Sequence, residues 1–120
     1  MYARVMHIHI LPGKLHDFLT AVDSLMPALK QQAGFRAMMI LRSAETPSRD
    51  GDDREISATT YTIWDSLEAV RASEKNMFLY QALARMKEHC KGFPQIHEDE
   101  VIAETMISAH HVPRSEDTQS

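Results

Sequence analysis

The sequence predicts a single α+β domain of the ferredoxin-like class, with βαββαβ order and a four-stranded antiparallel sheet. Strand-type and helix-type segments follow one another in the order strand, helix, strand, strand, helix, strand, which is the split βαβ pattern. The 120 residues, 43% of them hydrophobic, suffice for one core but not for two independent ones. A cofactor domain separate from a substrate domain is therefore not expected.

Charge and cysteine content exclude several classes of partner. The chain carries 17 acidic and 13 basic residues, a net charge of -4, with no run of lysine and arginine. This distribution does not suit nucleic acid or an anionic membrane surface. The apolar stretches are far shorter than the ~20 residues of a membrane span, and the single cysteine, Cys90, cannot form an internal disulfide. We expect a cytoplasmic protein without nucleic-acid or membrane partners.

The first strand is expected over Ala3 to Leu11, where apolar and β-branched residues dominate. Alternation along it places His7 and His9 on one face and the apolar even-numbered positions on the other. The first helix is expected from Leu15 to Leu29, because apolar residues recur there at spacings of three and four. Gly34 is suited to end the helical segment.

Two further strands are predicted at Phe35 to Ser43 and Glu55 to Trp64, joined by a polar loop over residues 44–54. Asp65 and Ser66 follow at once, and their side-chain oxygens are suited to cap the next helix. The middle of the chain is therefore expected to form a hairpin that leads directly into a helix.

The last third of the chain is predicted to contain a helix from about Lys75 to Lys91 and a fourth strand from Glu100 to Ser108. Gly92 and the nearby proline end the helical pattern. The domain is then expected to span residues 1–108, followed by a polar and aperiodic tail at 109–120.

A sheet of this class carries its helices on one face only, so the other face needs cover. Valine, methionine, threonine and isoleucine residues from several strands are expected on that uncovered face. An apolar surface of this size is costly to leave in water. We therefore expect two chains to stack sheet on sheet as a homodimer.

Three short motifs follow in order along the chain, at residues 10–14 (ILPGK), 33–43 (AGFRAMMILRS) and 63–69 (IWDSLEA). Their order and spacing resemble the antibiotic biosynthesis monooxygenase (ABM) family, over about residues 3–80. The resemblance implies a dimeric α+β barrel. It also implies a cofactor-independent monooxygenase, without metal, in which the anion of a small aromatic or quinol-type substrate gives an electron to dioxygen.

Six residues are candidates for this chemistry. The expected hydrogen-bond donors are Trp64, Tyr61, Tyr80 and Arg85, with His7 or His9 as the base. Trp64 matches the position at which ABM-like oxygenases can hold a tryptophan beside the substrate, although a core aromatic at the strand–helix corner would also explain it. One polyketide oxygenase of the family has an asparagine and a tyrosine where this chain has Thr60 and Val70.

Two alternative functions remain open at this stage. One is a non-catalytic small-ligand-binding or stress-associated dimeric module with the same fold. The other is haem degradation, but the asparagine, tryptophan and histidine of that branch are replaced by Met6, Ser73 and Leu83. His7 and His9 have the spacing of a metal pair, but the neighbouring strand offers no third ligand, so no metal site is predicted.

Overall fold

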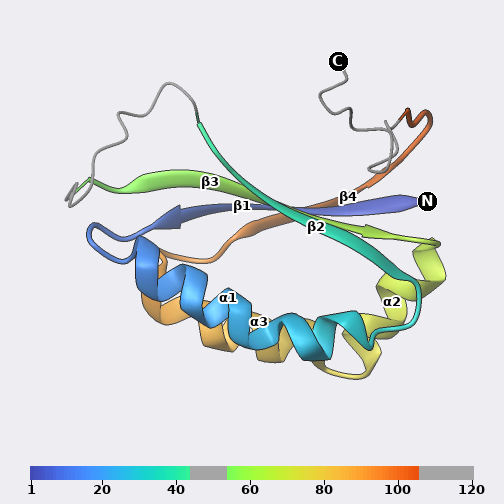
Figure 1. Ribbon diagram of the computed structural model, residues 1–120, viewed down its shortest axis with the longest axis horizontal. Helices are drawn as coiled ribbons and strands as arrows, with labels where there is room; N and C mark the ends of the chain where they lie inside the picture. Colours follow the sequence, from blue (N-terminus) through green and yellow to red (C-terminus); the bar gives the residue numbers. More distant parts are fainter. Residues whose placement is uncertain (44–53, 106–120) are drawn as a thin grey trace, which may run out of the picture.

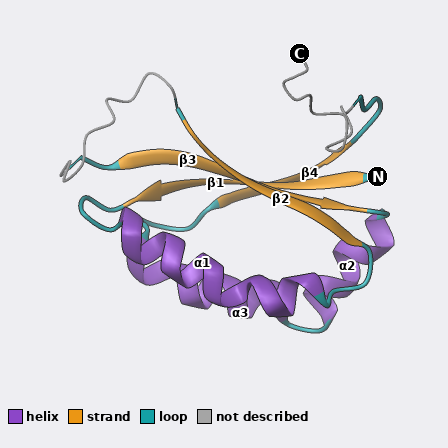
Figure 2. Cartoon of the chain, viewed as in Figure 1, coloured by secondary structure: helices purple, strands orange, loops and turns teal. Residues whose placement is uncertain are grey.

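The computed structural model describes residues 1–43 and 54–105, which form one antiparallel sheet covered on one face by helices (Figures 1 and 2). The elements in chain order are β1 (Tyr2–Ile10), α1 (Leu15–Lys30), β2 (Phe35–Arg42), β3 (Ile56–Trp64), α2 (Leu67–Lys75), α3 (Phe78–Met86), the short 3₁₀ helix η1 (Lys87–His89) and β4 (Gln95–Glu100). The strand order is β2-β3-β1-β4. The predicted ferredoxin-like α+β class is thereby confirmed.

The register of the sheet decides which side chains face the helices. Strand β1 pairs with β3 so that Arg4 lies opposite Thr62 and Met6 opposite Thr60. Because side chains alternate between faces, even-numbered residues of both strands point toward the helices and odd-numbered residues point away. The helix-facing side chains of β3 are all buried, as the alternating burial from Ile56 to Trp64 shows.

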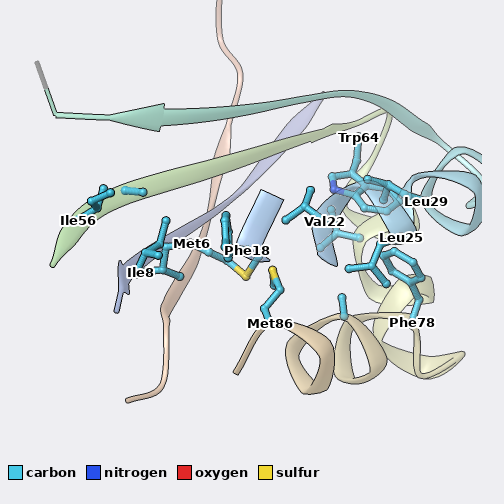
Figure 3. Close-up of a cluster of buried hydrophobic side chains, with 14 residues drawn as sticks. Met6, Ile8, Phe18, Val22, Leu25, Leu29, Ile56, Trp64, Phe78 and Met86 are labelled. Carbon is cyan, nitrogen blue, oxygen red and sulfur yellow. The ribbon is translucent and has the colours of Figure 1, made fainter. Parts of the chain in front are cut away.

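The core fills the space between this face and helices α1 and α3 (Figure 3). Met6 and Ile8 from the sheet meet Phe18 and Val22 from α1, and Met86 approaches from α3. Trp64 lies at the other end of the core, among the α1 leucines and Phe78 (Figure 3). The amphipathic pattern that predicted α1 therefore supplies one wall of the core.

Gly34 lies between α1 and β2, beside the end of β3 that carries Trp64. Its φ of +82° is in the region that favours glycine, and its carbonyl accepts a 2.8 Å hydrogen bond from the amide of Asp65. A β-carbon at this position would lie only 2.6 Å from the β-carbon of Ala69. The loop after α1 and the start of α2 thus depend on a residue without a side chain.

The second helical region is divided into three pieces. Ser66 caps α2 by accepting a hydrogen bond from the amide of Ala69, as predicted. The helix predicted over Lys75 to Lys91 is instead shorter, because the chain breaks at Asn76 and Met77, where Met77 has a φ of +69°. The Asn76 side chain then accepts from the amide of Phe78 and starts α3.

The fourth strand lies earlier in the chain than predicted. Strand β4 runs from Gln95 to Glu100, and residues 101–105 have no regular secondary structure. The prediction followed the apolar residues after position 100, but β4 is an edge strand that, among the described strands, pairs only with β1. Charged and polar side chains suit such an edge, so the strand lacks the apolar alternation that would reveal it.

Several predicted features lie outside the described residues. These are most of the loop at 44–54 and the boundary of the domain at residue 108 with the tail that follows. In the described part of the chain, the helices are too short or too polar to span a bilayer.

Candidate functional site

A small cavity lies between the sheet and helices α1 and α3, and we call it the sheet–helix cavity. Its volume is about 40 Å³, room for two or three water molecules. Its lining is mainly apolar, and the residues are Arg4, Met6, Val22, Leu25, Met26, Leu29, Met38, Thr60, Thr62, Trp64, Phe78, Leu79, Ala82 and Met86. The four methionines are flexible, so this lining is able to adapt to a ligand.

Arg4 supplies the charged part of the cavity wall, although only 3% of it is exposed. Its Nη1 donates to Ser73 Oγ at 3.0 Å, and its Nη2 donates to the Val70 carbonyl and to Glu74 Oε2, both at 3.0 Å. Burial lowers the pKa of the guanidinium, and the carboxylates of Glu74 and Glu98 oppose this effect. The group stays charged, since arginine loses its proton only far above neutral pH.

A chain of ion pairs fixes the position of Arg4. Glu74 also accepts from Arg71 at 2.9 Å, and Arg71 in turn contacts Glu98 on β4 at 3.2 Å. Helix α2 and strand β4 therefore hold the guanidinium from outside the cavity.

Trp64 and two threonines complete the polar wall. The Trp64 Nε1 group donates to Thr62 Oγ1 at 2.9 Å, and the Arg4 guanidinium carbon lies 5.9 Å from the centroid of the indole ring. Thr60 is 1% exposed. Its Oγ1 and the Nε of Arg4 are buried, and neither finds a hydrogen-bond partner within the described part of the chain. Such orphaned polar atoms are rare in folded proteins.

A second, larger space lies between α3, the chain that follows it and Ile8 of β1, and we call it the α3 groove. Its volume is about 530 Å³, within the usual range of small-molecule sites. Its lining is Ile8, Tyr80, Leu83, Ala84, Met86, Lys87, Glu88, Cys90, Gly92, Phe93 and Pro94. Met86 borders both this groove and the sheet–helix cavity.

Only one of the six predicted site residues, Trp64, borders the sheet–helix cavity. Tyr80 borders the α3 groove and is 54% exposed. Arg85 borders neither space and instead donates to Ser24 Oγ at 3.0 Å, which ties α3 to α1. The structure therefore does not bring Trp64, Tyr80 and Arg85 together around one cavity.

The remaining three, Tyr61, His7 and His9, lie on the face of the sheet that the helices leave uncovered. His7 shares a hydrogen bond of 3.1 Å with Thr59 Oγ1, and its ring stacks on that of His97 with 5.6 Å between centroids. His9 lies 3.2 Å from a carboxylate oxygen of Glu55. These side chains are separated from the sheet–helix cavity by the sheet itself.

Arg4 and Thr60, which line the cavity and have orphaned polar atoms, were not among the six predicted site residues. A signal for Arg4 was present, because it shares the face of Met6 and Ile8 on a strand flanked by two others. A charged residue among apolar ones on such a face has to be paired or to serve a ligand.

Metal and haem sites find little support in these residues. Within residues 1–43 and 54–105, no group of three or more histidine, cysteine, aspartate or glutamate side chains is placed to hold a metal ion. At the haem-branch positions, Ser73 is buried and bonded to Arg4, and Leu83 offers no ligand atom. The residues at these positions therefore do not fit haem.

The family model for antibiotic biosynthesis monooxygenase matches residues 1–93 of this sequence. The chain therefore belongs to the antibiotic biosynthesis monooxygenase family, in agreement with the resemblance of its motifs. No curated protein matches the sequence.

Solved structures share the fold at low sequence identity. A putative antibiotic biosynthesis monooxygenase from Bordetella bronchiseptica is 17% identical, with a TM-score of 0.64, over 85% of this chain and 97% of that one. SnoaB, a cofactor-independent oxygenase from Streptomyces nogalater, is 12% identical, with a TM-score of 0.64, over 89% and 98%. A mutant of MhuD with two manganese protoporphyrin IX molecules bound per active site is 18% identical, with a TM-score of 0.66, over 88% and 99%. At these identities the likeness concerns the fold alone.

Proposed function

We propose that the protein is a cofactor-independent monooxygenase that oxidises a small aromatic or quinol-type compound with dioxygen at the sheet–helix cavity. The observation that carries the proposal is the lining of this cavity, where Trp64 and the charged residue Arg4 lie among mainly apolar side chains. Hydrogen bonds to a developing charge are strongest in such a water-poor setting. Membership of the ABM family supports the same class of reaction.

The substrate would occupy both spaces, with its reacting end in the sheet–helix cavity and its body in the α3 groove. A volume of about 40 Å³ is enough for dioxygen or the reacting end of a molecule, whereas the α3 groove of about 530 Å³ accommodates an aromatic body. Met86 stands between them, and a change of its rotamer would join the two spaces. In this proposal the Tyr80 side chain, which borders the groove, would bond a polar edge of the substrate.

Anthrone is a suitable test substrate because its oxidation needs no outside reductant. The ionised ring system gives electrons to dioxygen, and the CH₂ group of anthrone becomes a carbonyl. One oxygen atom enters the product, and the other leaves as water with the two hydrogens. All four electrons come from the substrate, so atoms and charge balance without a cofactor.

Oxygen uptake by metal-free protein tests the proposal directly. We expect uptake with anthrone, and a loss of at least about tenfold in Trp64→Phe, because the indole positions the reacting ring. Tyr61→Phe on the uncovered face is the matched control and should keep the wild-type rate. The absence of uptake with anthrone and with a hydroquinone, or a Trp64→Phe rate equal to wild type, would overturn the proposal.

A non-catalytic ligand-binding module of the stress-associated kind is the second candidate. It is favoured by one observation: the described residues that border the cavity include no carboxylate, imidazole or phenol that would accept a proton. Tight binding of an aromatic ligand, detected as a thermal shift, with unchanged ligand after incubation in oxygen would support this reading.

We further propose that two chains form a homodimer through their uncovered sheet faces. Met39 and Leu41 on β2 are 52% and 47% exposed there, beside the half-buried Tyr61 and Ile63. Light scattering during gel filtration tests this assembly. Met39→Glu should give a monomer by burying charge in the interface. Leu19→Glu, at a position on α1 that is 44% exposed, should leave the dimer intact. A monomeric wild type would contradict the proposal.

A further inference from the structure

We infer that protonation of His7 weakens the homodimer, so that the assembly of two chains is controlled by pH. The inference rests on the homodimer proposed above, and it adds the residue that regulates this contact and the direction of the effect.

His7 lies at the centre of the face through which the two chains are proposed to pair. It belongs to β1, an inner strand with β3 on one side and β4 on the other, and its side chain is exposed in the single chain. Because side chains alternate along a strand, His7 points away from the helices, as Tyr61 on β3 does. Two sheets that stack face to face bury their central positions, so the imidazole would lose its contact with water in the dimer.

The side chains around His7 offer no negative charge that would balance a proton. Its ring shares a hydrogen bond of 3.1 Å with the neutral hydroxyl of Thr59. On β4 the residue opposite it is Gln95, and His97 is the next residue on the same face, with 5.6 Å between the two ring centroids. On β3 the titratable neighbour is Tyr61, and a phenol is neutral in the pH range in which histidine titrates.

The two carboxylates on this side of the sheet are paired with the other histidines. Asp99 Oδ2 lies 3.2 Å from His97 Nε2, and Glu55 Oε2 lies 3.2 Å from His9 Nδ1. The second oxygen of Glu55 contacts Lys91 Nζ at 3.5 Å. A proton on His97 or His9 is therefore balanced by an adjacent negative charge.

Protonation of His7 thus opposes the dimer but not the folded chain. Histidine gains its proton as the pH falls from about 8 to about 5. In the single chain water solvates the resulting charge, whereas in the dimer the charge would be buried without a partner, which is unfavourable. Twofold symmetry applies this cost once for each chain. By linkage, the dimer is tightest when the His7 ring is neutral, and it weakens as the pH falls.

Light scattering during gel filtration over a dilution series tests the inference at about pH 8 and about pH 5.5, a range in which free carboxylates keep their charge. The proteins are the wild type, His7→Gln and His9→Gln. His9→Gln is the matched control, because this histidine lies on the same strand and face but has Glu55 beside it. Circular dichroism at both pH values shows that each protein remains folded.

We expect the dissociation constant of the wild-type dimer to rise at least about tenfold from the higher to the lower pH, because each chain contributes one titrating imidazole. His7→Gln should give nearly the same dissociation constant at both pH values, and His9→Gln should weaken as the wild type does. A wild-type dimer of equal strength at both pH values, or a His7→Gln dimer that weakens as much as the wild type, overturns this inference and leaves the homodimer standing. A monomeric wild type at about pH 8 rejects both, and neither result bears on the oxygen-uptake test of the cavity.

Discussion

Replacement of Thr62 by valine should destabilise the protein, because it removes the hydrogen-bond acceptor of the Trp64 indole. The Trp64 Nε1 group is buried and donates to Thr62 Oγ1 at 2.9 Å. Valine has nearly the shape of threonine but no acceptor, so Thr62→Val strands the indole N–H in an apolar setting. Leaving a buried donor unpaired costs about 1–3 kcal/mol of unfolding free energy.

The matched control is Thr60→Val, two residues earlier on the same face of β3. Thr60 is at least as buried, but its hydroxyl has no partner among the described residues. Replacing an unpaired buried hydroxyl with a methyl group should leave the unfolding free energy unchanged or raise it by up to about 1 kcal/mol. Two chemically identical substitutions are therefore expected to have different consequences.

Urea unfolding followed by circular dichroism at one fixed protein concentration measures both effects. With a urea slope of about 2 kcal/mol per molar, Thr62→Val should lower the midpoint by about 0.5–1.5 M, and Thr60→Val should not lower it. Equal losses in the two variants would refute the reasoning, because they would mean that the Thr60 hydroxyl is already satisfied in the free protein.

Three further substitutions or reactions test other parts of the structure. Gly13→Ala imposes only positive-φ strain, about 1–2 kcal/mol, because nothing lies near its added β-carbon. Gly34→Ala should cost more unfolding free energy in a urea titration, because its β-carbon would also clash with that of Ala69. Adding Ala69→Gly to Gly34→Ala should recover the difference between the two glycine variants. Glu74→Gln should destabilise by about 1–3 kcal/mol in the same assay, because it weakens the charged hydrogen bond to the buried guanidinium on β1. Burial raises the pKa of the Cys90 thiol, so the folded protein favours the neutral thiol. The contribution of this thiol to stability should be complete below the free-thiol pKa and should decline as the pH rises above that pKa. At about pH 8.5, iodoacetamide should therefore alkylate the folded protein several-fold more slowly than the urea-unfolded chain.

Local patterns were sufficient to predict most of the fold. The first three strands and α1 begin and end within one or two residues of the predicted positions, because alternation and helical spacing are properties of neighbouring residues. Strand β4 was misplaced since its position depends on pairing with the distant β1, which needs no apolar alternation at an exposed edge. The break at Met77 was likewise invisible, because methionine has no intrinsic preference for positive φ.

The candidate site was harder to predict from the sequence than the fold, although alternation along the strands already decides on which face of the sheet each candidate residue lies. Tyr61 and Trp64 are three residues apart on one strand and so must point to opposite faces. The same rule places His7 and His9 on the face away from Met6, where they cannot act at a cavity beneath the helices. The orphaned atoms, in contrast, depend on which partners the folded chain supplies, and this is a three-dimensional property.

The burial of Arg4 is hard to explain by stability alone. Removing a guanidinium from water is expensive, and well-packed apolar residues often stabilise a core as much as a buried ion pair does. Here Ser73, Val70 and Glu74 satisfy Nη1 and Nη2 but leave Nε without a partner among the described residues, and Thr60, which lines the same cavity, has a second orphaned atom. Leaving a buried polar atom unpaired costs about 1–3 kcal/mol of unfolding free energy. The fold therefore carries a cost at these two positions that an apolar side chain of similar shape would remove, as the Thr60→Val prediction expresses.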